Sequence, residues 1–183
     1  MNSQPLATKS TRIRILVVDD DRAVRDAIRQ WLELCTRFEV VAEAADGVEA
    51  LCTVGEYLPD IVLMDISMPS MNGLEATAWL TQRFPQVRVI IHTASTDAHH
   101  VQRAIQAGAA AYLVKASYTR LALVIDEVAA GRAFIGLRGS QGNPVESNSE
   151  SEKQERQHVQ PPVPVGNQSA EIRDKLFIER KSV

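Results

Sequence analysis

The stretch from Pro59 to Gly73 restricts the fold of this chain more than any other. Its apolar run, Ile61 to Met64, ends abruptly at the carboxylate of Asp65, and a loop of turn-forming residues follows. A short apolar run closed by turn residues is typical of a strand that is buried on both faces. Open parallel sheets place their ligand chemistry at the carboxyl ends of such strands, which makes Asp65 a candidate functional residue. The alternative is that Asp65 only caps the following turn.

The rest of the chain alternates between strand and helix patterns. Strand patterns are found at 13–18, 38–44, 61–64, 87–91 and 111–114. Helical patterns follow each of them, at 22–32, 48–55, 74–84, 97–107 and 121–128. Right-handed crossovers between such units produce a parallel sheet that helices cover on both faces. We therefore predict a three-layer, doubly wound α/β fold with five parallel strands.

Composition separates one domain from its flanks. The 183 residues carry a net charge of −3, so there is no overall basic signal for nucleic acid. The polar amino end is not a signal peptide, and no apolar run approaches the ~18 residues of a membrane helix, so we expect a soluble cytoplasmic protein without a membrane partner. We predict a disordered lead-in at 1–12, a globular domain at 13–135, a disordered Pro- and Ser-rich linker at 136–166, and a helical segment at 167–183.

Polar side chains follow four of the five predicted strands at the point where each strand ends. Strand one is followed by Asp19 and Asp20, and strand three by Asp65. Strand four is followed, after His92, by Thr93, and strand five by Lys115. All carboxyl ends of a parallel sheet lie on one edge, so these side chains should converge. Taken singly, each has an ordinary alternative as a helix-start acid, a strand-edge hydroxyl or a solvated lysine. Their coincidence on strand ends favours one site.

The chemistry of this set indicates phosphoryl transfer. Three neighbouring carboxylates repel one another and require a cation, and oxygen ligands alone suit Mg²⁺. Asp65 is the candidate nucleophile, because an aspartate carboxylate can accept a phosphoryl group as an acyl phosphate. Lys115 supplies a positive charge and Thr93 a hydrogen-bond donor for the phosphoryl oxygens.

Four segments of the chain resemble the receiver domain of bacterial response regulators, the phospho-acceptor module of two-component signalling. The resemblance covers about residues 13–135 and is carried by ILVVDDD (15–21), DIVLMDISMPSMNGLEA (60–76), VIIHTAS (89–95) and GAAAYLVKAS (108–117). It implies a flavodoxin-like sheet with the strand order 2-1-3-4-5, and a protein that acts as a phosphorylated switch rather than as a turnover enzyme.

The resemblance also implies roles for the acidic residues. Asp65 would be the aspartate that a sensor histidine kinase phosphorylates. Asp20 would bind Mg²⁺ directly, Asp19 would bind it through water, and the backbone carbonyl of Ser67 would be a further ligand.

Two more residues would form the switch. Thr93 would move toward the phosphoryl group, which Lys115 would also contact, and Tyr112 would change rotamer together with Thr93. The alternative for Tyr112 is an ordinary strand aromatic. Ser67 and Ser95, two residues after Asp65 and Thr93, occupy positions that tune acyl-phosphate lifetime in the family.

The carboxyl-terminal segment has a second, less specific resemblance. Residues 171–183 resemble the turn region of a LuxR/NarL-type helix-turn-helix, but they stop where a recognition helix should begin. Prolines 161, 162 and 164 fall where the first helix of such a domain would lie. DNA is therefore an expected partner only if a complete helix-turn-helix exists beyond Val183.

Three functions remain open from the residues and the resemblance. The first is a phospho-switch, which could form a homodimer on phosphorylation through its first, fourth or fifth helix. The second is a DNA-binding transcription regulator of the LuxR type with an incomplete output domain. The third is a Mg²⁺-dependent phosphohydrolase of the haloacid dehalogenase kind, against which Ser67 stands where such enzymes use a second acid.

Overall fold

The computed structural model describes residues 12–115 and 118–136. The described strands are β1 (Ile13–Val18), β2 (Phe38–Ala44), β3 (Ile61–Met64), β4 (Arg88–Thr93), β5 (Ala111–Val114) and β6 (Phe134–Gly136). The described helices are α1 (Arg22–Glu33), α2 (Gly47–Tyr57), α3 (Gly73–Arg83), α4 (Ala98–Gln106) and α5 (Tyr118–Ala129). Of the predicted lead-in and linker only residues 12 and 136 are described, and the segment at 167–183 lies outside the described residues.

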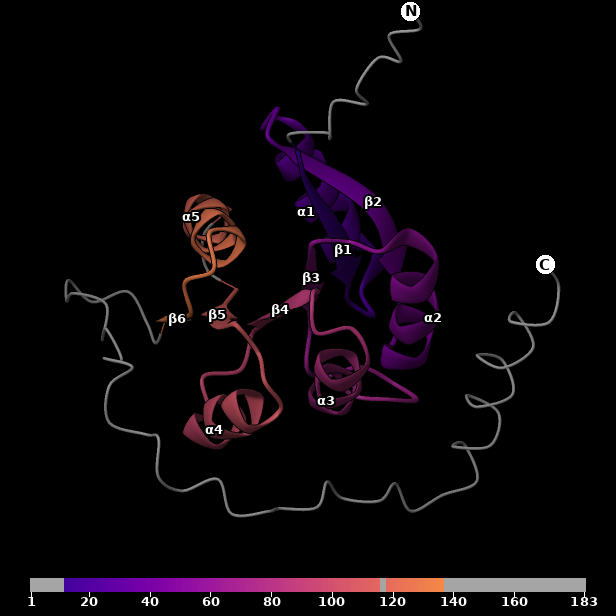
Figure 1. The fold of residues 1–183 in the computed structure, drawn as a ribbon, viewed down its shortest axis with the longest axis vertical. Helices are drawn as coiled ribbons and strands as arrows, with labels where there is room; N and C mark the ends of the chain where they lie inside the picture. Colours follow the sequence, from indigo (N-terminus) through magenta and orange to yellow (C-terminus); the bar gives the residue numbers. More distant parts are fainter. Residues whose placement is uncertain (1–11, 116–117, 137–183) are drawn as a thin grey trace, which may run out of the picture. The chain divides into compact units, whose positions relative to one another are not determined.

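The strands form one parallel sheet in the order β2-β1-β3-β4-β5-β6 (Figure 1). This confirms the predicted order 2-1-3-4-5 and adds one edge strand, β6, which pairs with β5. The sequence did not indicate β6, because three residues after a helix are too few to show a period of two. The short pairing places β6 beyond β5, away from the strands whose ends carry the acidic residues.

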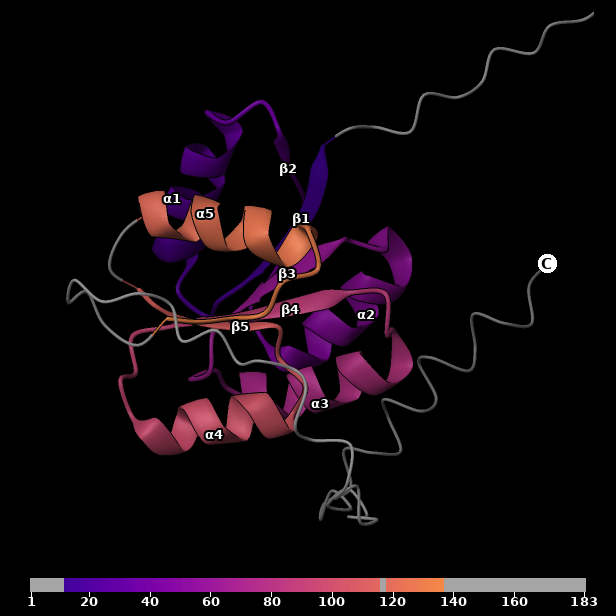
Figure 2. The ribbon, with the colours of Figure 1, turned by 60° about the vertical axis from the view of Figure 1, so that its left-hand side comes forward.

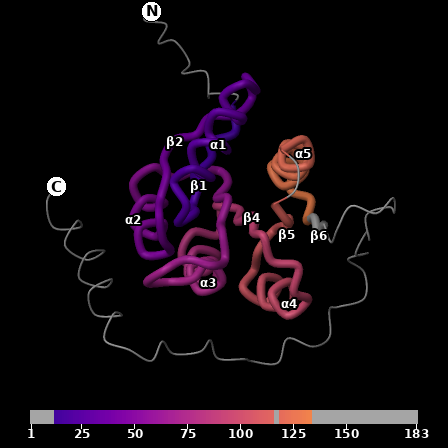
Figure 3. The backbone as a smooth tube through the Cα atoms, turned by 180° about the vertical axis from the view of Figure 1, so that it is seen from behind, coloured from indigo at the N-terminus to yellow at the C-terminus, as the bar shows by residue number. Residues whose placement is uncertain are grey.

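The sheet divides the core into two clusters. Figure 2 shows α1 and α5 on one side of the sheet and α2, α3 and α4 on the other, and Figure 3 shows the same layers from behind. Along β3 the side chains alternate between the two clusters: Ile61 and Leu63 pack toward α1 and α5, while Val62 and Met64 pack toward the other three helices. All four are buried, as predicted for this strand. Burial on both faces is why β3 is apolar throughout rather than alternating.

Side-chain caps define where several helices begin. Asp21 accepts a hydrogen bond from the Ala23 amide at 2.8 Å, which caps α1. Asp46 caps α2 by accepting from the Glu49 amide at 2.9 Å. The Glu49 carboxylate in return accepts from the Ala45 amide at 2.7 Å, so the two acids satisfy amides on both sides of the helix start, in a variant of the capping box. These caps fix short connections at the carboxyl edge of the sheet.

Candidate functional site

Two neighbouring strands deliver buried carboxylates to the same edge of the sheet. Asp19 follows β1 and Asp65 follows β3, and the Asp65 amide donates a hydrogen bond to the Val18 carbonyl at 2.9 Å. Asp19 and Asp65 are 2% and 5% exposed, whereas Asp20 is exposed. Oxygen atoms from these three carboxylates lie within 4.8 Å of one another. The predicted convergence of the acids is therefore present.

Lys115 brings the end of a third strand into this group. Its amide donates to the Thr93 carbonyl at 2.8 Å, which holds the residue beside the end of β4. Its ammonium Nζ lies 2.6 Å from Asp19 Oδ2 and 3.2 Å from Asp65 Oδ1. One half-buried cation thus bridges two buried carboxylates, which would otherwise repel each other.

Burial and pairing shift the ionisation of this group. Burial raises the pKa of Asp19 above its usual value, although the hydrogen bond from Lys115 opposes the change. Burial alone would lower the pKa of Lys115, but the hydrogen bond to Asp19 and the charges of both carboxylates outweigh it, so the pKa of Lys115 is raised. Lys115 therefore stays protonated at neutral pH and remains a fixed positive charge beside Asp65.

The oxygen atoms of the three acids fit a hard divalent cation. Asp19 has both oxygens engaged, one by Lys115 and the other by the Asp21 amide at 3.1 Å. Within the described part of the chain, no hydrogen bond to the Asp20 carboxylate is formed, and this carboxylate faces solvent. A set of oxygen donors with one free, accessible carboxylate suits Mg²⁺, which keeps several waters and few protein ligands.

The remaining predicted residues are distributed around this centre. Ser67 donates its amide to Asp65 Oδ2 at 3.2 Å, so the loop after β3 touches the central carboxylate. Thr93 is 2% exposed, and its hydroxyl accepts from the Ser95 amide at a long 3.4 Å. Tyr112 is also buried, and its hydroxyl donates to the Ser95 carbonyl at 3.0 Å. Thr93 and Tyr112 are thus joined to each other through Ser95.

Two residues that the sequence did not single out support the acidic loop. Arg25 of α1 donates from Nη1 to the Asp19 carbonyl at 2.7 Å and from Nε to Glu43 at 3.3 Å. Gly73 begins α3 so close to β3 that a Cβ there would lie 1.8 Å from the Asp65 carbonyl oxygen. Gly73 stood in the predicted loop as a turn residue, but nothing in its spacing signalled this close approach.

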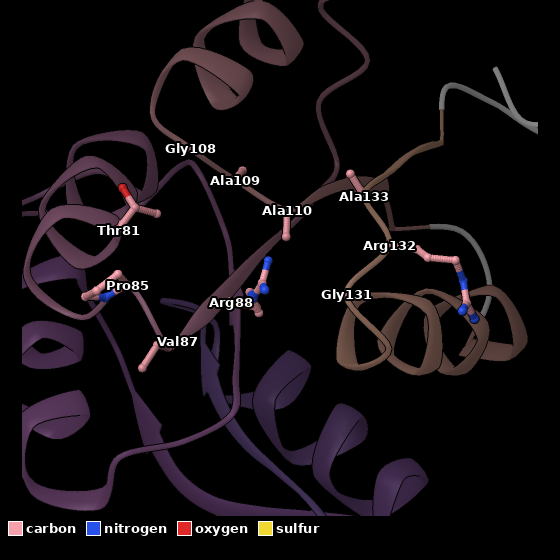
Figure 4. A pocket seen from close by; sticks show the side chains of 10 residues that line it. All are labelled: Thr81, Pro85, Val87, Arg88, Gly108, Ala109, Ala110, Gly131, Arg132 and Ala133. Carbon is pink, nitrogen blue, oxygen red and sulfur yellow. The ribbon is translucent and has the colours of Figure 1, made fainter. Parts of the chain in front are cut away.

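A cavity of about 290 Å³ lies at the amino ends of β4 and β5, opposite to the strand ends that carry the acidic residues (Figure 4). Its lining includes Arg88 at the start of β4, Ala110 just before β5 and Gly131 after α5. None of the predicted site residues lines it. This cavity is therefore separate from the acidic cluster.

Comparison with known proteins identifies the arrangement. A family model described as the response regulator receiver domain matches residues 15–125, which is more than half of the chain. The chain belongs to this family. The receiver resembles the crystal structure of a LuxR-family two-component response regulator from Aurantimonas sp. SI85-9A1, with a TM-score of 0.66 and 36% identity over 69% of this chain and 90% of that one. It is thus a receiver of the NarL/LuxR type.

Two curated relatives extend the similarity. The receiver is 38% identical to the transcriptional regulatory protein DegU of Brevibacillus brevis over 74% of this chain, and spans only 56% of that relative. The chain is 33% identical to the oxygen regulatory protein NreC of Staphylococcus aureus (strain JH9), over 93% of this chain and 86% of that protein. Among the described residues, no helix combines the length and apolarity needed to cross a membrane.

Proposed function

We propose that this receiver accepts a phosphoryl group on Asp65 from a sensor histidine kinase and changes conformation in response. A carboxylate oxygen of Asp65 would attack the phosphorus of the phosphohistidine, the P–N bond would break, and an acyl phosphate would remain on Asp65. The observation that carries this proposal is the position of Lys115. Its ammonium lies 3.2 Å from Asp65 and 2.6 Å from Asp19, where it would meet the added phosphoryl oxygens.

The acidic residues would hold the cation that this chemistry needs. We assign direct binding to Asp20 and Asp65 with the Ser67 carbonyl, and indirect binding through water to Asp19. The engaged oxygens of Asp19 and the free carboxylate of Asp20 support this division. Bound Mg²⁺ supplies positive charge that offsets the charge of the phosphoryl oxygens.

Thr93 and Tyr112 would report the phosphoryl group to the rest of the domain. Both are buried and both hydrogen-bond to Ser95. If the Thr93 hydroxyl turns toward a phosphoryl group on Asp65, its weak bond to the Ser95 amide is lost, and the loop that covers Tyr112 is free to move. This is a switch and not a turnover reaction, since the phosphoryl group stays on the protein until water removes it.

Phosphorylation by acetyl phosphate with Mg²⁺ tests the proposal. Intact mass spectrometry should show one added phosphoryl group on the unaltered chain and none on Asp65→Asn, because an amide is not a nucleophile at neutral pH. Asp60→Asn is the matched control: Asp60 precedes the same strand at its other end and accepts a hydrogen bond from the Arg14 amide. Full phosphorylation of Asp65→Asn would refute the assignment.

Regulation of transcription through DNA is the second candidate. The relative DegU is described as a transcriptional regulatory protein, and the alignment to NreC extends over 93% of this chain, beyond the receiver. We propose that the receiver occupies 13–135, with a linker at 136–166 and a partial LuxR-type segment at 167–183. A gel shift with promoter DNA, with and without phosphorylation, would separate this function from a receiver that acts on another protein.

A further inference from the structure

The loop between β4 and α4 is held by one residue, Ser95, which forms hydrogen bonds in four directions. Its amide donates to Thr93 Oγ1 at 3.4 Å, and its carbonyl accepts from the Tyr112 hydroxyl at 3.0 Å. Its own hydroxyl accepts from the Asp97 amide at 3.3 Å and lies 2.7 Å from Nδ1 of His100. Ser95 therefore joins the end of β4, the middle of β5 and the first turn of α4.

The bond to His100 is the shortest of the four. The imidazole and the hydroxyl keep this bond in either tautomer of the ring, because the hydroxyl both donates and accepts. The other three bonds join Ser95 to the Thr93 hydroxyl, the Asp97 amide and the Tyr112 hydroxyl, none of which lies within α4. Among the described residues, His100 is the one residue of α4 whose side chain hydrogen-bonds to Ser95, so this bond ties the first turn of α4 to the loop.

The loop in turn covers a buried aromatic ring. Tyr112 is 1% exposed, and its hydroxyl donates a hydrogen bond to the Ser95 carbonyl of this loop. Because Ser95 also contacts the hydroxyl of Thr93, any displacement of Ser95 changes the surroundings of both residues. Holding Ser95 thus restrains one hydrogen bond of Thr93 and one of Tyr112.

We propose that His100 is a positioning residue that couples the first turn of α4 to Thr93 and Tyr112 by holding the hydroxyl of Ser95. This inference rests on the proposed phosphorylation of Asp65. A protein that binds or displaces the first turn of α4 would change the acyl phosphate at Asp65 through this bond, and phosphorylation would change the surface of α4 in return. His99 is the neighbouring residue on the same turn; it is exposed, and within the described part of the chain its side chain forms no hydrogen bond, while its amide donates to the Asp97 carboxylate.

Phosphorylation kinetics of matched variants test this role. The full chain would be treated with acetyl phosphate and Mg²⁺, and the rate of formation and the lifetime of the acyl phosphate followed by mass spectrometry. Removing one neutral hydrogen bond corresponds to about a two- to tenfold change in an equilibrium. We expect His100→Ala to change the rate or the lifetime by this factor, and His99→Ala to leave both within error.

Two further variants separate positioning from a general structural effect. His100→Asn places an amide near the position of Nδ1 and should restore most of the change. Ser95→Ala removes the other partner, so the double variant Ser95→Ala/His100→Ala should differ little from Ser95→Ala alone. Amide hydrogen exchange at Asp97 should accelerate in His100→Ala and not in His99→Ala, with or without phosphorylation.

The outcomes distinguish the two proposals. If the unaltered chain is not phosphorylated at Asp65, the proposed function fails, and the inference fails with it. If the chain is phosphorylated but His100→Ala and His99→Ala behave alike, or if the effects of Ser95→Ala and His100→Ala simply add, the coupling by His100 is overturned while the proposed function stands.

Discussion

Replacing Gly73 with alanine should displace the backbone that carries Asp65. A Cβ at this position would lie 1.8 Å from the Asp65 carbonyl oxygen and 2.9 Å from Cγ of Met64. Ordinary contact begins at 3.4 Å, so the start of α3 and the end of β3 must separate by about 1.6 Å. The Gly73 amide donates to the Ile66 carbonyl at 3.0 Å, and this bond would be strained by the same movement.

The cost follows from what the new methyl group meets. Overpacking a close-packed region costs ~1–3 kcal/mol, and the upper end applies here because the obstacle is backbone that no rotamer change can move. Alanine is favoured over glycine in a helix by up to ~1 kcal/mol, which offsets part of this cost. We expect Gly73→Ala to lower the free energy of unfolding by ~2 kcal/mol or more, and to slow phosphorylation because Asp65 moves with the strand end.

Gly55→Ala is the matched control. Gly55 is exposed near the end of α2, and a Cβ there would meet only Phe84 at 3.8 Å, which is ordinary contact. This variant should be stabilised by ~0.5–1 kcal/mol through helix propensity. Equilibrium urea unfolding followed by circular dichroism measures both, and initial rates with acetyl phosphate measure the second effect. Equal stability of the two variants would refute the argument from close approach.

Two further predictions concern stability. His92 in β4 is 7% exposed, and burial, followed by the nearby charge of Lys115, lowers its pKa from 6.5 to about 4. In this pH range the unfolded chain therefore binds a proton at His92 that the folded chain does not bind. As the pH falls from about 6.5 to 4, the free energy of unfolding of the unaltered protein should fall by ~3 kcal/mol more than that of His92→Gln. If urea unfolding gives the same pH dependence for both proteins, the prediction is wrong. Leu58 caps α2 in a left-handed conformation with φ 46°, so Leu58→Gly should raise the stability of the protein by up to ~1 kcal/mol. Leu34 caps α1 in a right-handed conformation with φ −68°, so Leu34→Gly should lower the stability. Thermal melts of both variants measure this difference.

The sequence predicted the strands better than the contacts between them. The run from Ile61 to Met64 was predicted to be a doubly buried strand, because a short apolar run between turn signals is typical of one, and the structure confirms it. The order of the strands came from the resemblance rather than from periodicity, and it is also confirmed. The edge strand β6 was missed because its three residues carry no pattern.

The convergence of the charged site residues was predictable from topology, but the residues that hold the loops around them were not. Asp19, Asp65 and Lys115 follow directly on strands, so parallel order alone brings them to one edge. Arg25 reaches the Asp19 carbonyl because α1 is rotated so that this side chain faces the β1–α1 loop. His100, in the first turn of α4, contacts Ser95 in the loop before that helix. Such contacts depend on how helices are rotated and placed against the sheet, which no local pattern specifies.

The division of the interior by the sheet has a consequence for how this protein tolerates change. Tyr112 packs in the cluster shared with α2, α3 and α4, while Ile28 of α1 and Ile125 of α5 pack in the other cluster. A void opened on one side can be refilled only by neighbours on that side, because the strands form a wall between them. The layer with α1 and α5 can therefore accumulate and compensate substitutions independently, without disturbing the layer that contains Tyr112.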